Sequence, residues 1–133
     1  MPRRVLDTNI LINHWGHRRR GRPHAEIQPD DARAWATELI SLQQTKAIVT
    51  PVAIEFLAGQ ESARAVFLAQ TFLSQFDRID QGRILPQDWA DAERLARRVP
   101  VDRSRRQLGD CLIRAVCNRL GYEPVTVDRR FPG

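Results

Sequence analysis

Cysteine and long apolar runs are scarce in this chain of 133 residues. Its two cysteines, Cys111 and Cys117, lie six residues apart in a predicted helix, where steps of about 100° per residue place them on different faces. We expect reduced, buried thiols there, not a disulfide or a metal site. The apolar runs fall far short of the ~20 residues that cross a bilayer. Residues 1–4 are basic but precede no long apolar segment of a secretion signal. These absences favour a cytoplasmic protein.

Lysine is almost missing as well. Lys46 is the only one, so 20 arginines carry nearly all of the positive charge, and the formal net charge is +5. Arginine binds phosphate through two parallel hydrogen bonds, which favours a nucleic-acid partner. The same bias can come from genome composition, and one sequence does not separate the two causes. The length predicts one domain over residues 1–133, and 42% hydrophobic with 28% charged residues excludes wholesale disorder.

Short strands alternate with longer helices along the sequence. Such alternation favours parallel strands joined by right-handed crossovers, so we expect a three-layer α/β/α sandwich around a small parallel sheet. The expected strands are 3–7, 47–49, 76–79 and 125–127; the expected helices are 8–15, 30–46, 50–58, 62–76, 87–99 and 108–120; basic loops are expected at 16–29 and 101–106. Thr50 is expected to cap its helix. Trp15, Trp35 and Trp89 occupy apolar helical positions and are expected in the core or in a dimer interface.

Four carboxylates fall at one edge of the predicted sheet. Asp7 and Asp128 directly follow strands, while Glu55 and Asp110 lie in the first turns of helices. Ligands of open parallel sheets bind beyond the carboxyl ends of the strands. Four like charges in one cleft repel each other unless a cation compensates them. Oxygen ligands suit Mg²⁺ or Mn²⁺, and such an ion delivers water to a phosphodiester and stabilises the leaving oxygen.

Four segments carry a resemblance to a known family. Residues 5–12 (VLDTNILI), 50–59 (TPVAIEFLAG), 108–113 (LGDCLI) and 125–131 (VTVDRRF) resemble, in order and spacing, the four motifs of PIN-domain ribonucleases. The size of the chain and the Thr-Pro…Glu motif resemble VapC-type toxins of bacterial toxin–antitoxin systems. This resemblance covers nearly the whole chain and implies a PIN-like fold.

The resemblance also implies an activity and partners. It implies a Mg²⁺- or Mn²⁺-dependent endoribonuclease that forms a homodimer, is inhibited by a cognate antitoxin, and binds operator DNA only together with that antitoxin. Asp7 and Asp110 match the principal metal ligands, and Glu55 and Asp128 match the acids that complete the catalytic site. The polar neighbours that would orient carboxylates or waters are Thr8, Asn9 and Thr126.

Two arginine clusters flank the predicted site. They comprise Arg18, Arg19, Arg20 and Arg22 in one loop, and Arg103, Arg105 and Arg106 in the other. Phosphate contacts need charge more than sequence, so both clusters are candidates to contact RNA. An acidic antitoxin segment is an equal candidate, and a solvated loop is the plain structural alternative.

Two other functions fit parts of the pattern. A catalytically weak PIN-like module that binds RNA or an antitoxin would keep the fold and the basic loops without cleaving. A phospho-acceptor receiver domain also gathers aspartates after strands, but it requires paired acids after the first strand and a lysine late in the chain. Here one Asp ends the first strand and Lys46 is far from the last strand.

Overall fold

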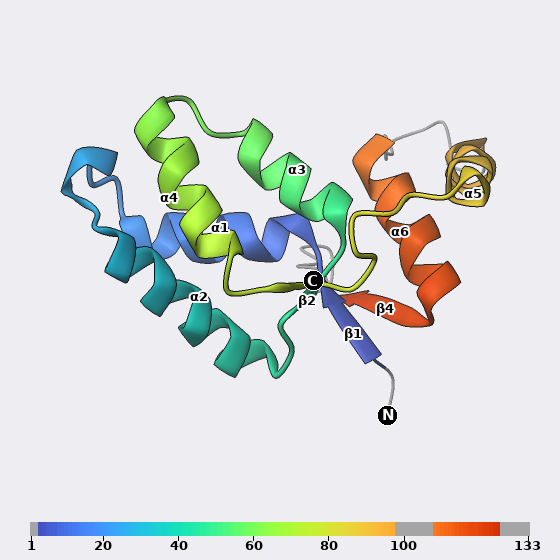
Figure 1. The fold of residues 1–133 in the computed structure, drawn as a ribbon, viewed down its shortest axis with the longest axis horizontal. Helices are drawn as coiled ribbons and strands as arrows, with labels where there is room; N and C mark the ends of the chain where they lie inside the picture. Colours follow the sequence, from blue (N-terminus) through green and yellow to red (C-terminus); the bar gives the residue numbers. More distant parts are fainter. Residues whose placement is uncertain (1–2, 98–107, 126–133) are drawn as a thin grey trace, which may run out of the picture.

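Short parallel strands lie between two groups of helices (Figure 1). The computed structural model describes residues 3–97 and 108–125. The strands are β1 (Arg3–Leu6), β2 (Ala47–Ile48), β3 (Asp77–Arg78) and β4 (Tyr122–Val125); the helices are α1 (Thr8–Arg19), the 3-10 turn η1 (His24–Glu26), α2 (Pro29–Gln43), α3 (Thr50–Ala58), α4 (Ala63–Leu73), α5 (Pro86–Arg97) and α6 (Leu108–Leu120). In Figure 1, α1, α2 and α4 gather on one side of the strands, and α5 and α6 on the other.

The strands pair in parallel, as predicted. β1 pairs with β4, with Arg3 opposite Tyr122 and Leu6 opposite Val125. β2 pairs with β3, and β1 also lies against β2. Parallel pairing places the carboxyl ends of β1 and β4 at the same edge. The predicted α/β/α sandwich with a small parallel sheet is therefore confirmed.

An aromatic cluster holds the helices that carry the candidate site. Trp15 of α1 packs edge-on against Trp35 of α2, with ring centroids 5.3 Å apart, and against Phe72 of α4 at 5.1 Å. It also meets Phe56 of α3 at 6.1 Å. Trp15, Phe56 and Phe72 are nearly or fully buried. Edge-on aromatic pairs add to the free energy of burial, so this cluster fixes α1 and α3 relative to each other.

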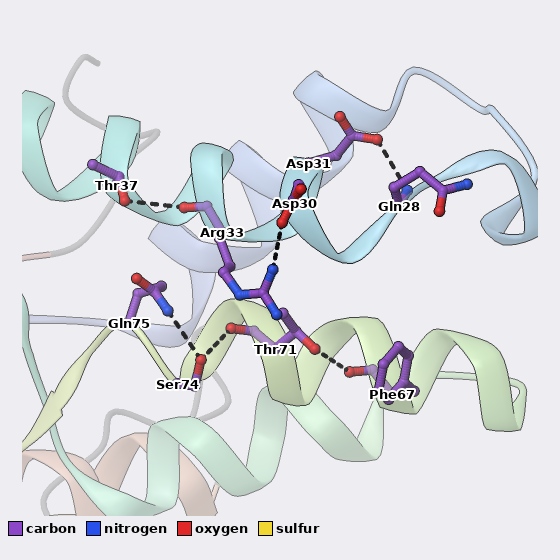
Figure 2. Close-up of polar contacts among 9 residues, drawn as sticks. All are labelled: Gln28, Asp30, Asp31, Arg33, Thr37, Phe67, Thr71, Ser74 and Gln75. Atoms are coloured by element: carbon purple, nitrogen blue, oxygen red, sulfur yellow. Dashed lines mark hydrogen bonds and ion pairs between the residues drawn. The ribbon is translucent and has the colours of Figure 1, made fainter.

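Local capping sets the ends of α2. The backbone N–H of Gln28 donates to Oδ2 of Asp31 at 2.9 Å, and Pro29 opens the helix (Figure 2). Arg33 and Asp30 form an exposed ion pair at 2.6 Å on the same helix (Figure 2). The start was predicted at residue 30, from the preference of aspartate for the cap position; the structure places it one residue earlier, with Pro29 at the first helical position.

A buried ion pair joins α5 to α6. Asp88 is fully buried, and its carboxylate accepts hydrogen bonds from Nε of Arg119 at 2.8 Å and from Nη2 of Arg119 at 2.9 Å. The backbone N–H of Leu85 also donates to Asp88 at 2.8 Å. Burial alone raises the pKa of Asp88, but the hydrogen bonds from Arg119 and Leu85 outweigh it and hold that pKa below its ordinary value.

This ion pair also accounts for the exposure of Trp89. The buried face of α5 carries Asp88 and Ala92, one helical turn apart, and Trp89 is half exposed, so it lies outside the core and its place in a dimer interface stays a prediction. Burial of Asp88 has no signal in the sequence pattern, because an unpaired buried carboxylate is costly. Its partner, Arg119, lies 31 residues away in the sequence. Trp15 and Trp35 are buried as predicted.

The prediction of a basic loop at residues 16–29 is wrong for residues 16–19, which are helical. Helix α1 runs through Gly16 to Arg19 and ends at Arg20, which has a left-handed φ of 54° and donates its N–H to the carbonyl of Gly16. A glycine inside a helix costs only about 1 kcal/mol, and the surrounding contacts outweigh that cost. His17, Arg18 and Arg19 lie in the last turn, where positive charge is favourable.

The last strand begins earlier than expected. Gly121, with φ of 77°, ends α6 as predicted, and the chain enters β4 at once at Tyr122. Glutamate and proline are rare in strands, so Glu123 and Pro124 resembled a turn in the sequence. Residues 126 and 127 of the predicted strand lie outside the described residues.

Both cysteines are buried thiols in α6, as predicted. Burial raises the pKa of Cys117 to about 12, which makes this thiol unreactive at neutral pH. Within the described ranges, the helices are too short or too polar to span a bilayer.

Candidate functional site

Three of the four predicted acids line one cleft. Asp7 follows β1, Glu55 lies in α3 and Asp110 lies in the first turn of α6. The cleft has a volume of about 420 Å³, and its other lining residues are Thr8, Asn9, Ile12, Ala58 and Gly59. We call it the acid cleft. The fourth acid, Asp128, lies outside the described residues, as does Thr126.

Asp7 links the sheet to the first helix. Its backbone N–H donates to the carbonyl of Val125 at 2.9 Å, which continues the β1–β4 pairing to the strand end. Its side chain caps α1, with Oδ1 accepting from the N–H of Thr8 at 2.7 Å. Asp7 is half-buried and lines the acid cleft. One carboxylate thus has both a capping contact and a place in the cleft.

Glu55 is held by the residue that follows Asp7. The hydroxyl of Thr8 is buried and donates to Oε1 of Glu55 at 2.5 Å. Burial raises the pKa of Glu55; the Thr8 hydrogen bond opposes that shift, and the negative charges of Asp110 and Asp7 add to it. The acids therefore act on each other electrostatically across the cleft, as predicted for like charges that share a site.

Gly109 lets α6 approach this carboxylate. A Cβ atom added to Gly109 would lie 1.7 Å from Oε2 of Glu55 and 2.4 Å from its Cδ. No side chain fits there unless Glu55 moves. The glycine before Asp110 therefore allows the first turn of α6 to bring Asp110 to the same cleft as Glu55. Its role was missed because a glycine next to a helix start is usually interpreted as part of the cap.

A buried aspartate anchors the helix that carries Glu55. Asp80 follows β3, is almost fully buried and accepts from the N–H and the hydroxyl of Thr50, both at 2.8 Å. It also accepts from the N–H of Gly82 at 3.2 Å. Thr50 was expected to cap α3 itself. Instead α3 begins at Thr50, and its cap is a side chain 30 residues later in the sequence.

The sequence matches one family over almost its whole length. The description of that family is PIN domain, and the match covers residues 4–132. The chain belongs to the PIN domain family. No curated protein and no solved structure matched the chain. PIN domains are nucleases in general and use divalent metal ions, so nuclease chemistry is the function that the family assigns.

The acid cleft of this PIN domain suits a hydrated divalent cation. Among residues 3–97 and 108–125, no three His, Cys, Asp or Glu side chains lie close enough together to form a complete ligand set. Mg²⁺ keeps several of its waters and needs only one or two carboxylates in direct contact. Burial is the main cause of the raised pKa of Glu55, and the negative charges of Asp110 and Asp7 add to it, so a cation beside these carboxylates would oppose the rise. The hard oxygen donors of the cleft therefore fit Mg²⁺ or Mn²⁺ better than zinc.

The first arginine cluster of the PIN domain is partly engaged by its own fold. Nε of Arg18 lies 3.1 Å from Glu38, Arg20 ends α1, and the guanidinium of Arg22 lies 5.6 Å from the centre of the Trp35 ring. Arg19 lines a second cleft beside the acid cleft. Contact of these residues with RNA or an antitoxin stays a prediction. The second cluster, at residues 103–106, lies outside the described residues.

Proposed function

We propose that this PIN domain is a Mg²⁺- or Mn²⁺-dependent endoribonuclease that hydrolyses RNA phosphodiester bonds. The observation that supports it best is the acid cleft, in which carboxylates from β1, α3 and α6 meet around one opening. The net charge of +5 suits a polyanionic substrate, although the cleft itself is acidic. A cation is the natural link between an acidic cleft and an RNA phosphate.

The acidic and polar residues of the cleft have separate roles in this proposal. Asp7 and Asp110 hold the cation, and Asp128 completes the set from the segment after β4. When bound, the cation lowers the pKa of water and stabilises negative charge on phosphate oxygens. Thr8 fixes the orientation of Glu55 through its hydroxyl, and the raised pKa of Glu55 makes its carboxylate a better proton acceptor. Asn9 lines the cleft and is exposed, so its amide can orient a water or a phosphate oxygen; Thr126, outside the described residues, has the same proposed role from the family motif.

We further propose that the protein is the toxin of a toxin–antitoxin pair. Support comes from its size and its Thr50-Pro51…Glu55 segment, which resemble VapC-type toxins. The proposal includes a homodimer in the cytoplasm, a cognate antitoxin that inhibits cleavage, and operator DNA bound only through the antitoxin complex. Conditional expression in a bacterial host tests this role: growth should stop, and Asp7→Asn should restore growth.

The nuclease proposal is tested with single-stranded RNA and purified protein. Cleavage is expected with Mg²⁺ or Mn²⁺ and should stop with EDTA. Asp7→Asn and Asp110→Asn should each lower the rate by about a hundredfold or more, because several kcal/mol of transition-state stabilisation depend on the cation. Asp30→Asn is the matched control, since Asp30 is exposed on α2 and pairs only with Arg33 in the described structure (Figure 2).

Two results would contradict the proposal. Full activity in both cleft variants would remove the acids from catalysis. RNA binding that is equal with and without metal, with no cleavage at all, would favour the alternative of a PIN-like binding module.

A further inference from the structure

A second cleft opens beside the acid cleft. It has a volume of about 330 Å³ and shares two walls with the acid cleft, Ile12 of α1 and Gly59 at the end of α3. Trp15 and Phe56, both almost completely buried, contribute apolar walls. An RNA strand with a phosphate in the acid cleft therefore has a neighbouring pocket within reach of its adjoining nucleotide. We call this second cleft the side pocket.

The polar groups of the side pocket include an unsatisfied donor. Nε of Arg19 is buried and makes no hydrogen bond with the described residues. A buried donor without an acceptor is costly, so a movement of the Arg19 side chain that brings its guanidinium to an acceptor on a ligand removes that cost. His24, Gln60 and Glu61 also line the pocket. The charges of Arg19 and Glu61 both act on His24, so a cationic donor and an anionic acceptor lie around the same opening.

We propose that the side pocket binds the nucleobase next to the cleaved phosphate and prefers guanine. This inference rests on the proposed function, because it assumes that RNA occupies the acid cleft. Arg19 donates to O6 or N7 of the base, a pairing that arginine commonly makes with guanine. Glu61 accepts from N1–H and the N2 amino group on the opposite edge. Adenine presents N7 to Arg19 but has no O6, and it has neither the N1–H nor the N2 amino group for Glu61, so it satisfies the two residues less well than guanine does.

Size and surroundings favour a base over a bare phosphate. A pocket of about 330 Å³ lies at the lower end of the range for small-molecule sites. Its apolar walls suit the flat face of a base, since single-stranded nucleic acids gain affinity from contact of bases with apolar and aromatic side chains. A phosphate alone would leave those walls uncovered and would lie close to Glu61, a like charge.

The test measures RNA binding in Ca²⁺, an oxygen-binding cation that can occupy the acid cleft in place of Mg²⁺, and a gel checks that the RNA stays intact. The probes are two fluorescein-labelled single-stranded RNAs of equal length, one of adenines only and one with a single central guanine. Wild-type protein is expected to bind the guanine RNA about tenfold more tightly in fluorescence anisotropy. Arg19→Gln should remove this preference and leave the affinity for the adenine RNA nearly unchanged.

Two further variants sharpen the test. Arg19→Lys keeps the positive charge but loses the planar donor group, so it should also lose the guanine preference while it still binds RNA. Glu61→Gln should reduce the preference for guanine over inosine, which lacks the N2 amino group. Arg33→Gln is the control, because Arg33 is an exposed arginine of α2 paired with Asp30, outside both clefts (Figure 2). Circular dichroism checks that each variant is folded.

The outcomes separate this inference from the nuclease proposal. Guanine preference that depends on Arg19, without cleavage when Mg²⁺ or Mn²⁺ is added, would support the side pocket and contradict the nuclease. Metal-dependent cleavage with no effect of Arg19 or of guanine would keep the nuclease and overturn the side pocket. Binding that is insensitive to Arg19 would assign the pocket to another occupant, such as a protein segment, and would equally overturn the proposal.

Discussion

The carboxylate of Glu55 occupies the space that a side chain at position 109 would need. Glu55 is held on one side by the hydroxyl of Thr8 and meets the backbone of Gly109 on the other. The carboxylate thus has little freedom, although it sits at the end of a flexible side chain. Its position depends on an absent side chain as much as on a hydrogen bond.

Replacement of Gly109 should separate activity from stability. In Gly109→Ala the new Cβ displaces the Glu55 carboxylate and breaks its hydrogen bond with Thr8, at a cost of about 1 kcal/mol, while alanine favours the helix by up to about 1 kcal/mol. We therefore expect a nearly unchanged free energy of unfolding and a fall of kcat by about tenfold or more, as when the groups that orient a metal site are disturbed. Urea unfolding and RNA cleavage at saturating substrate measure the two effects.

The control for this variant is another glycine inside a helix. In Gly16→Ala the added Cβ meets no atom within 4 Å, so the helix gains stability. Because Gly16 lines the side pocket, this variant is a control for stability alone. An unchanged kcat in Gly109→Ala would contradict the role given to Gly109.

The sequence predicted that three acids gather at one cleft, but not which contacts hold them there. Asp7, Glu55 and Asp110 follow from their places at strand ends and helix starts, and the structure places all three at one cleft. The support of Glu55 by Gly109, and the anchoring of α3 by Asp80, depend on contacts over more than 20 residues of sequence. Local patterns carry no signal for such contacts, because periodicity describes one element at a time.

At the scale of elements, the ion pair of Asp88 and Arg119 keeps α5 against α6, the helix that carries Asp110. Two N–H groups of one guanidinium bond the two carboxylate oxygens, an arrangement that gives strong, oriented contacts. The main-chain N–H of Leu85 satisfies Asp88 further. Removal of one partner leaves the other charge without compensation.

Loss of Arg119 should therefore be severe. Arg119→Ala leaves the fully buried Asp88 unpaired and is expected to lower the free energy of unfolding by about 3–5 kcal/mol at about pH 7. Arg94→Ala on α5 is the matched control, since Arg94 forms an exposed pair with Asp91 and should cost less than about 1 kcal/mol. Urea unfolding of the two variants measures the difference.

The pH dependence of this effect has a definite sign. The pKa of Asp88 is held below its ordinary value of 3.8, so its ionised form stabilises the folded state above that pH. This stability is lost as the pH falls through the lowered pKa. The difference in the free energy of unfolding between wild type and Arg119→Ala should consequently shrink as the pH falls below 3.8 and through the lowered pKa. A difference that stays constant from about pH 7 through this acid range would show that lost packing, not charge, causes the destabilisation.

The ends of elements were harder to predict than their order. Pro51 indicated the start of α3 within one residue and Gly121 the end of α6, because each residue type constrains the backbone directly. Such signals failed at Gly16, where tertiary contacts keep α1 helical, and at Pro124, where a strand tolerates proline. A local signal gives the wrong boundary wherever tertiary packing outweighs the unfavourable propensity of one residue, about 1 kcal/mol for a glycine in a helix.

At the scale of the whole molecule, a positively charged chain surrounds an acidic opening. The net charge is +5, yet Asp7, Glu55 and Asp110 line one cleft. Burial raises the pKa of Glu55, and the charges of Asp110 and Asp7 raise it further. The folded protein binds the Glu55 proton more tightly than the unfolded chain does. Stability from this group is therefore full below its ordinary pKa of 4.5 and is lost as the pH rises through the raised value. Folding brings these charges together at a cost that a cation can offset.

At a pH above the pKa of Glu55, a bound divalent cation should stabilise the folded protein against the repulsion between the cleft carboxylates. Mg²⁺ or Mn²⁺ at about 100 times its Kd adds about 2.7 kcal/mol to the free energy of unfolding, seen as a higher Tm in a thermal melt. Below the raised pKa, protonation of Glu55 weakens metal binding, and the rise in Tm becomes smaller.

Glu55→Gln, which keeps an acceptor for Thr8, should have a higher Tm than wild type without metal at neutral pH, and its Tm should rise less with Mg²⁺. Asp7→Asn should also gain less, whereas Asp30→Asn should behave as wild type. An equal rise in Tm for all four proteins would place the cation outside the acid cleft, because only contacts within that cleft distinguish Glu55 and Asp7 from Asp30.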